Sequence, residues 1–305
     1  MIDAYRGLAE VLARRGDYPE AVTTLEQARH ISNRNFGLFN LDQLEILDEL
    51  SAVYESAGDT RQAQETQREI LGVAERHFGA DDAGVAPYHM RLAEYYELAR
   101  MRGLARDQYE QALEILTDDP HTQPADTLRP LRELVRIDTL LGEPSNARRR
   151  LTDALASTGN APPLERAASL AVLGDAQLAA GATAEAFALY AEAYAALPDP
   201  AAAAAFFASP QMINFVPPPG PVDWSRRIDR EYAWGSITLS FALSAEGRAR
   251  DIRVVDASPP GLMDARYVQR LGEAAFRPRI VGGLPTPTAR LRYFHEFRYF
   301  LPETD

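Results

Sequence analysis

LSAVYESAGDTRQA, at residues 50–63, is the stretch that decides the fold of most of the chain. Its leucine recurs at Leu8, Leu50, Leu92, Leu134 and Leu173, and its last alanine recurs at Ala21, Ala63, Ala105, Ala147 and Ala186. Both series advance by 42 residues three times and then by 39. A constant period of this length predicts a repeat protein in which each unit folds as a helix, a turn and a second helix.

Small residues mark the turn and the helix crossing within each unit. Gly16, Gly58, Gly142 and Gly181 stand between the two helices, and Arg100 breaks this glycine series in the third unit. The alanines let paired helices approach closely, while leucine and aromatic side chains fill the space beside them. We therefore expect a mainly α protein, with an α-solenoid of about five helix-turn-helix repeats at residues 1–200.

This alternation of small and large residues resembles the tetratricopeptide repeat family, in the longer form of kinesin light chain. The resemblance implies a groove that is lined by the first helix of each unit and binds proteins or peptides. The positions that the family directs into the groove are charged here: Glu45, Asp48, Glu55, Glu94, Glu97, Arg129, Arg132 and Arg136. The groove should then be acidic toward the N-terminus and basic near its C-terminal end.

The three arginines follow one another at spacings of three and four residues, so they share one face of a helix. They could clamp the carboxylates of a partner, because a guanidinium pairs with a carboxylate through two hydrogen bonds. Alternatively, they form a solvated face or salt bridges to Glu94 and Glu97 of the neighbouring unit. The sequence leaves both interpretations open.

From residue 235 the pattern changes from helical to strand-like. Residues 237–243, 251–255 and 290–299 read as strands, with a turn at Ala245–Gly247 and a short helix from about Met263 to Ala275. We expect a small α+β domain at residues 223–305 in the order strand, strand, helix, strand. A proline-rich linker at residues 201–222 should precede it.

Glu246-Gly247-Arg248 in the hairpin and Phe276-Arg277-Pro278 after the helix make this domain similar to the C-terminal domain of TonB-type energy transducers. Val222-Asp223-Trp224-Ser225 stands where that family usually has a Tyr-Pro step. The resemblance implies that the final strand lies at a sheet edge and pairs with an extended segment of an outer-membrane transporter. Alternatively, the strand is paired inside its own sheet or covered by the repeats.

On that final strand, charged residues and one aromatic residue alternate with apolar ones. The candidate contact residues are Arg290, Arg292, Phe294, Glu296 and Arg298. Phe294 falls on the charged side, where an exposed aromatic ring could contact a partner.

Composition narrows the chemistry that the chain can perform. It has 305 residues and a net charge of −12, with 13 Arg against 11 acidic residues in residues 222–305 and a net −14 in residues 1–221. Such an acidic helical part argues against nucleic acid as a partner. The absence of Lys and Cys excludes Schiff-base, P-loop and thiol chemistry. None of the five histidines has metal-ligand spacing, so we expect no metal, no cofactor and no enzyme activity.

These observations favour a non-enzymatic adaptor or scaffold with protein or peptide partners. We expect it in the periplasm, with an export signal or anchor missing from this chain, although a protein that begins at Met1 would stay in the cytoplasm. The alternative is a component of TonB-type energy transduction whose anchor is missing here. An enzyme would require a deep polar pocket with several convergent titratable groups.

Overall fold

The structure is a computed structural model that describes residues 1–143, 146–159, 161–221 and 232–300. The chain forms two compact units, Met1–Pro130 and Leu131–Asp305. None of the helices in these ranges is long and apolar enough to cross a membrane. The predicted Val222-Asp223-Trp224-Ser225 step, and with it the expected boundary between linker and C-terminal domain, lies outside the described residues, so these domain limits stay a prediction.

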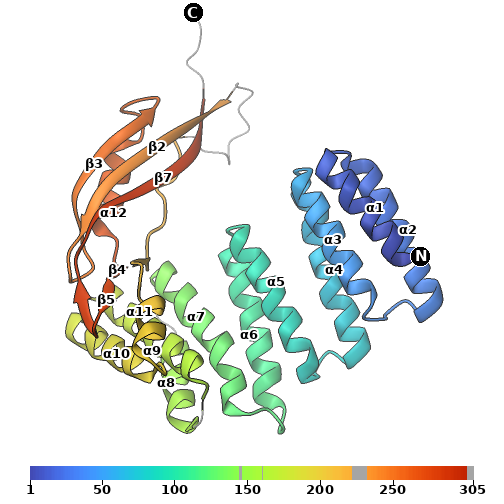
Figure 1. Ribbon diagram of the computed structural model, residues 1–305, viewed down its shortest axis with the longest axis horizontal. Helices are drawn as coiled ribbons and strands as arrows, with labels where there is room; N and C mark the ends of the chain where they lie inside the picture. The colour runs from blue at the N-terminus through green and yellow to red at the C-terminus, as the bar shows by residue number, and fades with distance from the viewer. Residues whose placement is uncertain (144–145, 160, 222–231, 301–305) are drawn as a thin grey trace, which may run out of the picture. The chain divides into compact units, whose positions relative to one another are not determined.

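The first unit consists of three helical hairpins stacked in chain order (Figure 1). Its helices are α1 (Ile2–Arg15), α2 (Tyr18–Phe36), α3 (Gln43–Ser56), α4 (Thr60–Phe78), α5 (Ala86–Leu98) and α6 (Arg102–Asp118). Two short 3₁₀ turns, Ala83–Val85 and Pro124–Thr127, precede the third and fourth hairpins. The predicted helix-turn-helix units are therefore confirmed.

The repeated alanines and leucines are buried, as the period predicts, with one exception. All five alanines of the series are buried, as are the last four leucines, Leu50, Leu92, Leu134 and Leu173. Leu8 is 51% exposed. In the described chain, α2 packs against α3, but no helix covers the corresponding face of α1. Leu50, the same position in the second repeat, is buried because α2 of the first repeat packs against α3.

The turn inside each unit has the same left-handed backbone, even where the glycine is missing. Gly16, Gly58, Gly142 and Gly181 have φ of 84°, 78°, 72° and 84°, and Arg100 has φ of 60°. A residue with a Cβ is strained in this conformation. The turn of the third repeat therefore has the same geometry as the turns with glycine, and its backbone is strained at Arg100.

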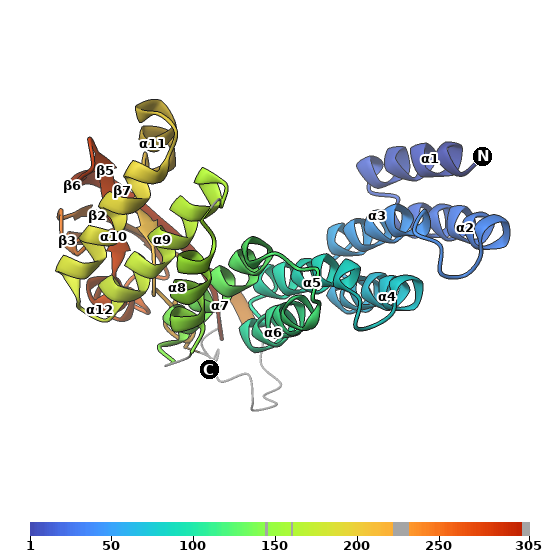
Figure 2. The ribbon, with the colours of Figure 1, turned by 90° about the horizontal axis from the view of Figure 1, so that it is seen from below.

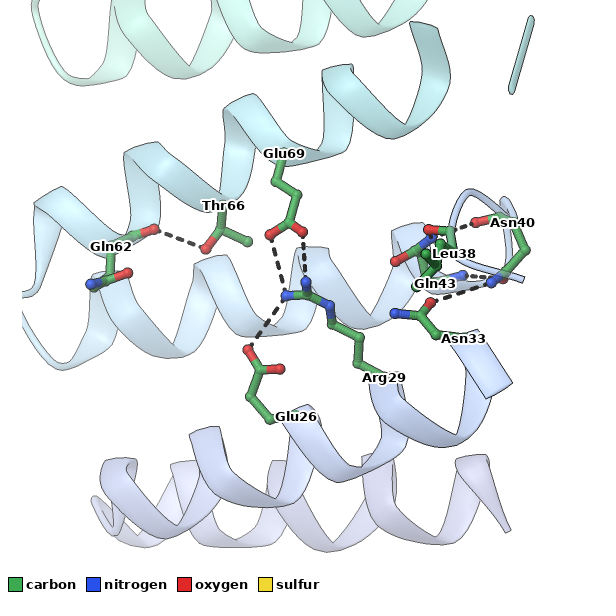
Figure 3. A network of polar contacts seen from close by, with 9 residues as sticks. All are labelled: Glu26, Arg29, Asn33, Leu38, Asn40, Gln43, Gln62, Thr66 and Glu69. Carbon is green, nitrogen blue, oxygen red and sulfur yellow. Dashed lines mark hydrogen bonds and ion pairs between the residues drawn. The ribbon is translucent and has the colours of Figure 1, made fainter. Parts of the chain in front are cut away.

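The loop between α2 and α3, which connects the first repeat to the second, is held by polar contacts among its own residues (Figure 3). The Oδ1 atom of Asn40 accepts hydrogen bonds from the backbone N–H of Gln43, at 3.0 Å, and from the Ser32 hydroxyl, at 3.1 Å. The Gln43 side chain donates to the Leu38 carbonyl at 2.6 Å. These contacts fix the loop between α2 and α3, which carries part of the extra length of this repeat.

The second unit contains the remaining repeat helices and the C-terminal sheet. The helix α7 (Leu128–Leu141) crosses the boundary between the units and is followed by α8 (Ala147–Ser157), α9 (Pro163–Ala179), α10 (Thr183–Ala196) and α11 (Pro200–Phe206). α10 ends two residues before Pro198, and α11 occupies the first part of the predicted linker.

Within the described C-terminal residues, 211–221 and 232–300, the elements are three long strands, one helix and four short strands. They are β1 (Gln211–Met212), β2 (Tyr232–Leu243), β3 (Ala249–Ser258), α12 (Asp264–Glu273), β4 (Phe276–Arg277), β5 (Arg279–Val281), β6 (Leu284–Thr286) and β7 (Thr288–Phe300). Side by side in the antiparallel sheet, the long strands have the order β3-β2-β7. Along the chain, β2, β3, α12 and β7 follow in the predicted order strand, strand, helix, strand. The pairs β1-β4 and β5-β6 were not predicted.

The core of this domain lies between one face of the sheet and α12. Tyr267 and Leu271 of α12 are fully buried against Ile237, Leu239 and Phe241 of β2. Gly247 has φ of 74°, and a Cβ at this residue would collide with the Phe276 carbonyl oxygen. The hairpin glycine is therefore required both for the turn and for close approach of the chain after α12.

A buried ion pair joins the last repeat to the sheet domain. Arg277 of β4 donates from Nε to Oδ1 of Asp175 on α9 at 2.9 Å, and from Nη2 to Oδ2 at 2.7 Å. The two side chains are only 12% and 13% exposed. The Tyr190 hydroxyl donates a third hydrogen bond to the Asp175 Oδ1 at 2.9 Å. This carboxylate is thus held by partners from two parts of the second unit.

The surroundings of the pair favour the charged form of Arg277. Burial opposes the charge of Arg277, but the charge and hydrogen bonds of Asp175 outweigh it and keep the pKa of Arg277 above its usual value. Burial, followed by the Asp175 charge, raises the pKa of Tyr190, so its hydroxyl keeps the proton that it donates. The rings of Phe206 and Phe207 lie 6.0 Å from the guanidinium.

Replacing Arg100 by glycine should stabilise the first unit. We expect R100G to raise the free energy of unfolding by about 0.5–1 kcal/mol, because relief of the left-handed strain exceeds the freedom that glycine adds to the unfolded chain. The reverse change, G58R, should lower it by about 1 kcal/mol. Denaturant unfolding followed by circular dichroism measures both, and a loss of stability in R100G would contradict the strain.

Removing Asp175 should destabilise the second unit far more than removing an exposed ion pair. We expect D175A to lower the free energy of unfolding by about 3 kcal/mol, because Arg277 stays buried without its counter-charge. The control is R166A, which removes a half-exposed pair with Glu192 and should cost less than about 1 kcal/mol. Equal effects in chemical denaturation would show that the buried pair does not hold the junction.

Candidate functional site

The structure places the predicted acidic groove residues on the first helices of the second and third repeats. Glu45, Asp48 and Glu55 lie on α3, and Glu94 and Glu97 lie on α5. Glu55 is exposed and Glu97 is half-buried. All five belong to the unit Met1–Pro130, so they line one stack of hairpins.

Three of these carboxylates pair with arginines of neighbouring helices. Glu45 accepts an ion pair from Arg6 of α1 at 2.8 Å. Asp48 pairs with Arg91 of α5, and Glu94 pairs with Arg129 at the start of α7. Burial, followed by the charge of Glu55, raises the pKa of Tyr95 on α5. Three of the five predicted groove carboxylates are therefore engaged in ion pairs with arginines of other helices.

The predicted arginine stripe is also engaged in ion pairs. Arg132 is only 13% exposed and binds Glu165 of α9 at 2.6 Å. Arg136 binds Glu133 on its own helix at 2.7 Å. The salt bridge from Arg129 to Glu94 is one that the sequence allowed, whereas the Glu165 partner was not foreseen. A role of these arginines in partner binding stays a prediction.

The helices α1 and α3, which are the first helices of the first two repeats, lie side by side (Figures 1 and 2). Residues of both helices line a cleft. Its volume is about 560 Å³. The residues that line it come from α1, α2 and α3: Asp3, Arg6, Gly7, Ala9, Glu10, Ala13, Leu25, Glu49, Ala52, Val53 and Ser56. This volume falls in the range of binding pockets in proteins.

The cleft has an apolar floor because small residues of the two helices face each other. Ala9 and Leu25 are buried, and Ala13, Ala52 and Val53 complete the floor. Without large side chains the helices leave space that water or a partner must fill. The small residues of α1 and α3 were the available signal, but the sequence analysis did not identify this cleft.

The rim of the cleft is acidic. Arg6 binds Glu49 at 2.7 Å and Glu45 at 2.8 Å, and the hydrogen bond that Arg6 donates to Glu49 is the largest cause that raises the pKa of Arg6. Asp3 lies 3.9 Å from the same guanidinium, and Glu10 pairs with Arg14 at 2.6 Å. Of the residues that line the cleft, Asp3, Glu10 and Glu49 are acidic and Arg6 is basic, which leaves an excess of negative charge.

The second candidate surface is the final strand, which lies at the edge of its sheet. In the described part of the chain, β7 pairs with β2 on one side and has no strand on the other. The predicted contact residues Arg290, Arg292, Phe294, Glu296 and Arg298 are all exposed and alternate with partly or fully buried neighbours. Whether they bind a partner stays a prediction.

The proline-rich segment before the sheet runs beside this strand. The Phe215 ring packs against Tyr293 with centroids 4.9 Å apart, Pro218 is buried, and Gly220 lies close to the carbonyl oxygen of Arg298. Proline has no backbone N–H, so it cannot donate a ladder hydrogen bond to β7. Proline beside an edge strand is one way in which proteins prevent edge-to-edge aggregation.

No metal site accompanies these surfaces within the described ranges: no group of three or more His, Asp or Glu side chains there could hold an ion. Asp3, Glu10, Glu45 and Glu49 surround arginine side chains instead.

Comparison with known proteins identifies the N-terminal hairpins. Residues 1–76 match the family described as tetratricopeptide repeat. All residues that line the cleft between α1 and α3 lie inside this matched segment. Repeats that stack in this way present extended binding surfaces to other proteins.

Solved structures of helical repeat proteins resemble the chain. One is a putative kinesin light chain with nearly identical TPR-like repeats from Podosopora anserina, at 22% identity, 64% coverage of this chain, 94% of that chain and a TM-score of 0.47. Another is BtubC (BKLC) from P. vanneervenii, at 19% identity, 75% and 87% coverage and a TM-score of 0.49. A comparison with curated proteins gave no match.

Proposed function

We propose that the chain is a non-enzymatic protein-interaction scaffold whose cleft between α1 and α3 binds a basic, partly apolar segment of a partner protein. The observation that carries the proposal is the combination of a floor of small apolar residues with a rim of carboxylates in a cleft of about 560 Å³. The negative charge of the rim argues against nucleic acid as the partner of this cleft.

The two parts of the cleft select different features of a partner. The apolar floor gains free energy from an aliphatic or aromatic side chain, at about 25 cal/mol for each Å² removed from water. The rim carboxylates of Asp3 and Glu10 favour a neighbouring Lys or Arg, and they reject an acidic segment by repulsion.

Arg6 sets the number of carboxylates that are free for a partner. It holds Glu45 and Glu49 in ion pairs, and its side chain is 28% exposed at the edge of the cleft. An incoming guanidinium therefore meets Asp3 and Glu10 first and shares Glu49 with Arg6. This arrangement should make binding sensitive to salt, because the rim charges are exposed.

The cleft proposal is tested with two labelled peptides, one of alternating Arg and Leu and one of alternating Glu and Leu. In fluorescence anisotropy at low ionic strength, the basic peptide should bind about tenfold more tightly than the acidic one. The variants D3N/E10Q and A52W should each weaken binding of the basic peptide about tenfold, the first by loss of charge and the second by filling the cleft.

The matched control is E110Q/E114Q on α6, which makes the same change of net charge on a second helix outside the cleft. This control should bind the basic peptide like the unmodified protein. If it weakens binding as much as D3N/E10Q, the attraction is general and the cleft is not the site. Unchanged binding in A52W would also contradict the proposal.

A second candidate function is docking of an extended segment on β7, which the resemblance to energy transducers implies. The position of β7 at the sheet edge favours it, since an edge strand leaves backbone groups available for another strand. In this alternative the chain serves TonB-type energy transduction to outer-membrane transporters. We propose export to the periplasm on the same resemblance, together with the absence of Cys, which suits an oxidising compartment.

Hydrogen exchange measured by mass spectrometry tests docking on β7. An extended peptide of alternating Thr and Val should slow exchange in residues 288–300 and leave β3, the opposite edge strand, unchanged. Equal protection of both strands would indicate non-specific association, and no protection would remove this candidate. Fractionation of the native cells tests export, which recovery in the cytoplasmic fraction alone would contradict.

A further inference from the structure

The sheet domain has a second face that α12 does not cover. Along β2, the residues Trp234, Ser236, Thr238 and Ser240 point away from the buried face that holds Ile237 and Leu239. Their register partners complete this open sheet face: Ser258, Asp256 and Arg253 on β3, and Arg298, Glu296, Phe294 and Arg292 on β7. The face is thus built from all three long strands.

Four arginines gather at one end of the open sheet face. Arg253 and Arg292 are the register partners of Ser240 on its two sides, and Arg250 pairs with the next outward position, Ala242. Arg290 lies two residues from Arg292 on β7, and all four side chains are exposed. We call these four residues the arginine cluster.

The arginines of the cluster are not held in ion pairs by other described residues. In the part of the chain that the structure describes, none of its members forms an ion pair or a side-chain hydrogen bond, although Asp251 and Asp256 lie on the same strand as Arg253. A hydrogen bond involving Ser244 and, to a smaller degree, the charge of Arg250 lower the pKa of Glu246 in the hairpin. The groove arginines of the repeats, such as Arg6 and Arg132, are by contrast paired.

The arginine cluster concentrates positive charge on an exposed surface, where it does not contribute to the packing of the sheet domain. Arg253 and Arg292 lie two strand spacings apart, about 10 Å, with only the small Ser240 between them. Like charges at this distance repel and weaken the sheet slightly. A carboxylate placed above Ser240 could reach both guanidinium groups and would remove that repulsion.

Exposed apolar side chains lie in the rows beside the arginine cluster. Phe294 is 59% exposed and is the register partner of Thr238, one outward row from Ser240. Val255, in the irregular part of β3, is 54% exposed. Trp234 at the far end is 59% exposed, and the Arg298 guanidinium stacks on it at 4.7 Å. Exposed aromatic rings next to arginine are typical of binding surfaces.

We propose that the open sheet face binds an acidic segment of a partner protein, with carboxylates on the arginine cluster and an aromatic or aliphatic side chain on Phe294. Charge complementarity selects this partner. Single-stranded nucleic acid also combines negative charge with stacking groups, but residues 1–221 of the chain carry a net charge of −14, which repels a polyanion at long range. An acidic segment of protein carries fewer charges and meets less repulsion.

This site is independent of the cleft between α1 and α3. It lies in the other compact unit, and its charge has the opposite sign. It uses the side chains of the sheet face, whereas docking of an extended segment on β7 uses backbone groups of the edge. Failure of either earlier proposal therefore leaves this one untouched.

The test uses the full chain and a short labelled peptide of alternating Glu and Trp. In fluorescence anisotropy at low ionic strength, the protein should bind it more tightly than an oligothymidylate of equal length. The variant R253S/R292S should weaken peptide binding about tenfold or more, because it removes the paired guanidinium groups. F294S keeps every charge and should weaken binding about fivefold through loss of the aromatic contact.

The matched control is R266S/R270S on α12, which removes the same number of charges from the opposite side of the domain. It should bind the acidic peptide like the unmodified protein, and melting curves show that each variant is folded. Tighter binding of the oligothymidylate would overturn the proposal in favour of nucleic acid. No binding of the acidic peptide, or equal weakening in R253S/R292S and the control, would also overturn it.

Discussion

The ion pair between Asp175 and Arg277 is the contact on which the architecture of the second unit depends. It joins α9 of the last repeat to β4, which follows α12 in the sheet domain. The pair is almost completely removed from water, and Tyr190 occupies a further acceptor position of the carboxylate. A buried charge is tolerated only when its partner has the correct geometry, so the pair admits one placement of β4 on α9.

This constraint explains why the sheet domain and the last repeats form a single compact unit. β4 pairs with β1, which lies before the long strands in the chain and follows α11 of the helical part. Segments before and after β2 and β3 in the chain therefore lie together at this junction. Phe206 and Phe207 flank the guanidinium and exclude water from the pair. The resulting junction holds both faces of the sheet in a fixed relation to α9, which suits a protein that presents surfaces to partners.

The repeats could be predicted from sequence because their signals are local. The spacing of alanine, leucine and glycine decides where two adjacent helices cross and turn, and neither depends on distant residues. Leu8 fits the series but is exposed, because its burial requires a preceding helix. Arg100 departs from the series yet adopts the same backbone as the glycines, since its neighbours impose the turn. The short strands β1, β4, β5 and β6 were missed because two or three residues show no period.

The binding surfaces could be predicted only in part, for a related reason. Sequence located Glu45 and Arg132 on first helices, but their partners Arg6 and Glu165 lie on neighbouring units, and only the fold brings them together. The cleft depends on which small residues face each other across α1 and α3. The arginine cluster depends on strand register, which sets Arg253 and Arg292 on either side of Ser240.

Pairing distinguishes the arginines that hold the fold from those that are available for binding. Within the described residues, Arg6, Arg29, Arg132 and Arg277 each contact a carboxylate, and in the case of Arg29 the fork binds both oxygens of Glu69 (Figure 3). Because this chain has no lysine, arginine must serve both purposes. The arginine cluster on the sheet forms no ion pair within the described residues, while Asp3, Glu10 and Glu49 line the cleft of the repeats. The cleft between α1 and α3 and the open sheet face thus carry opposite charges, so the basic and the acidic segment proposed above would not compete for one site.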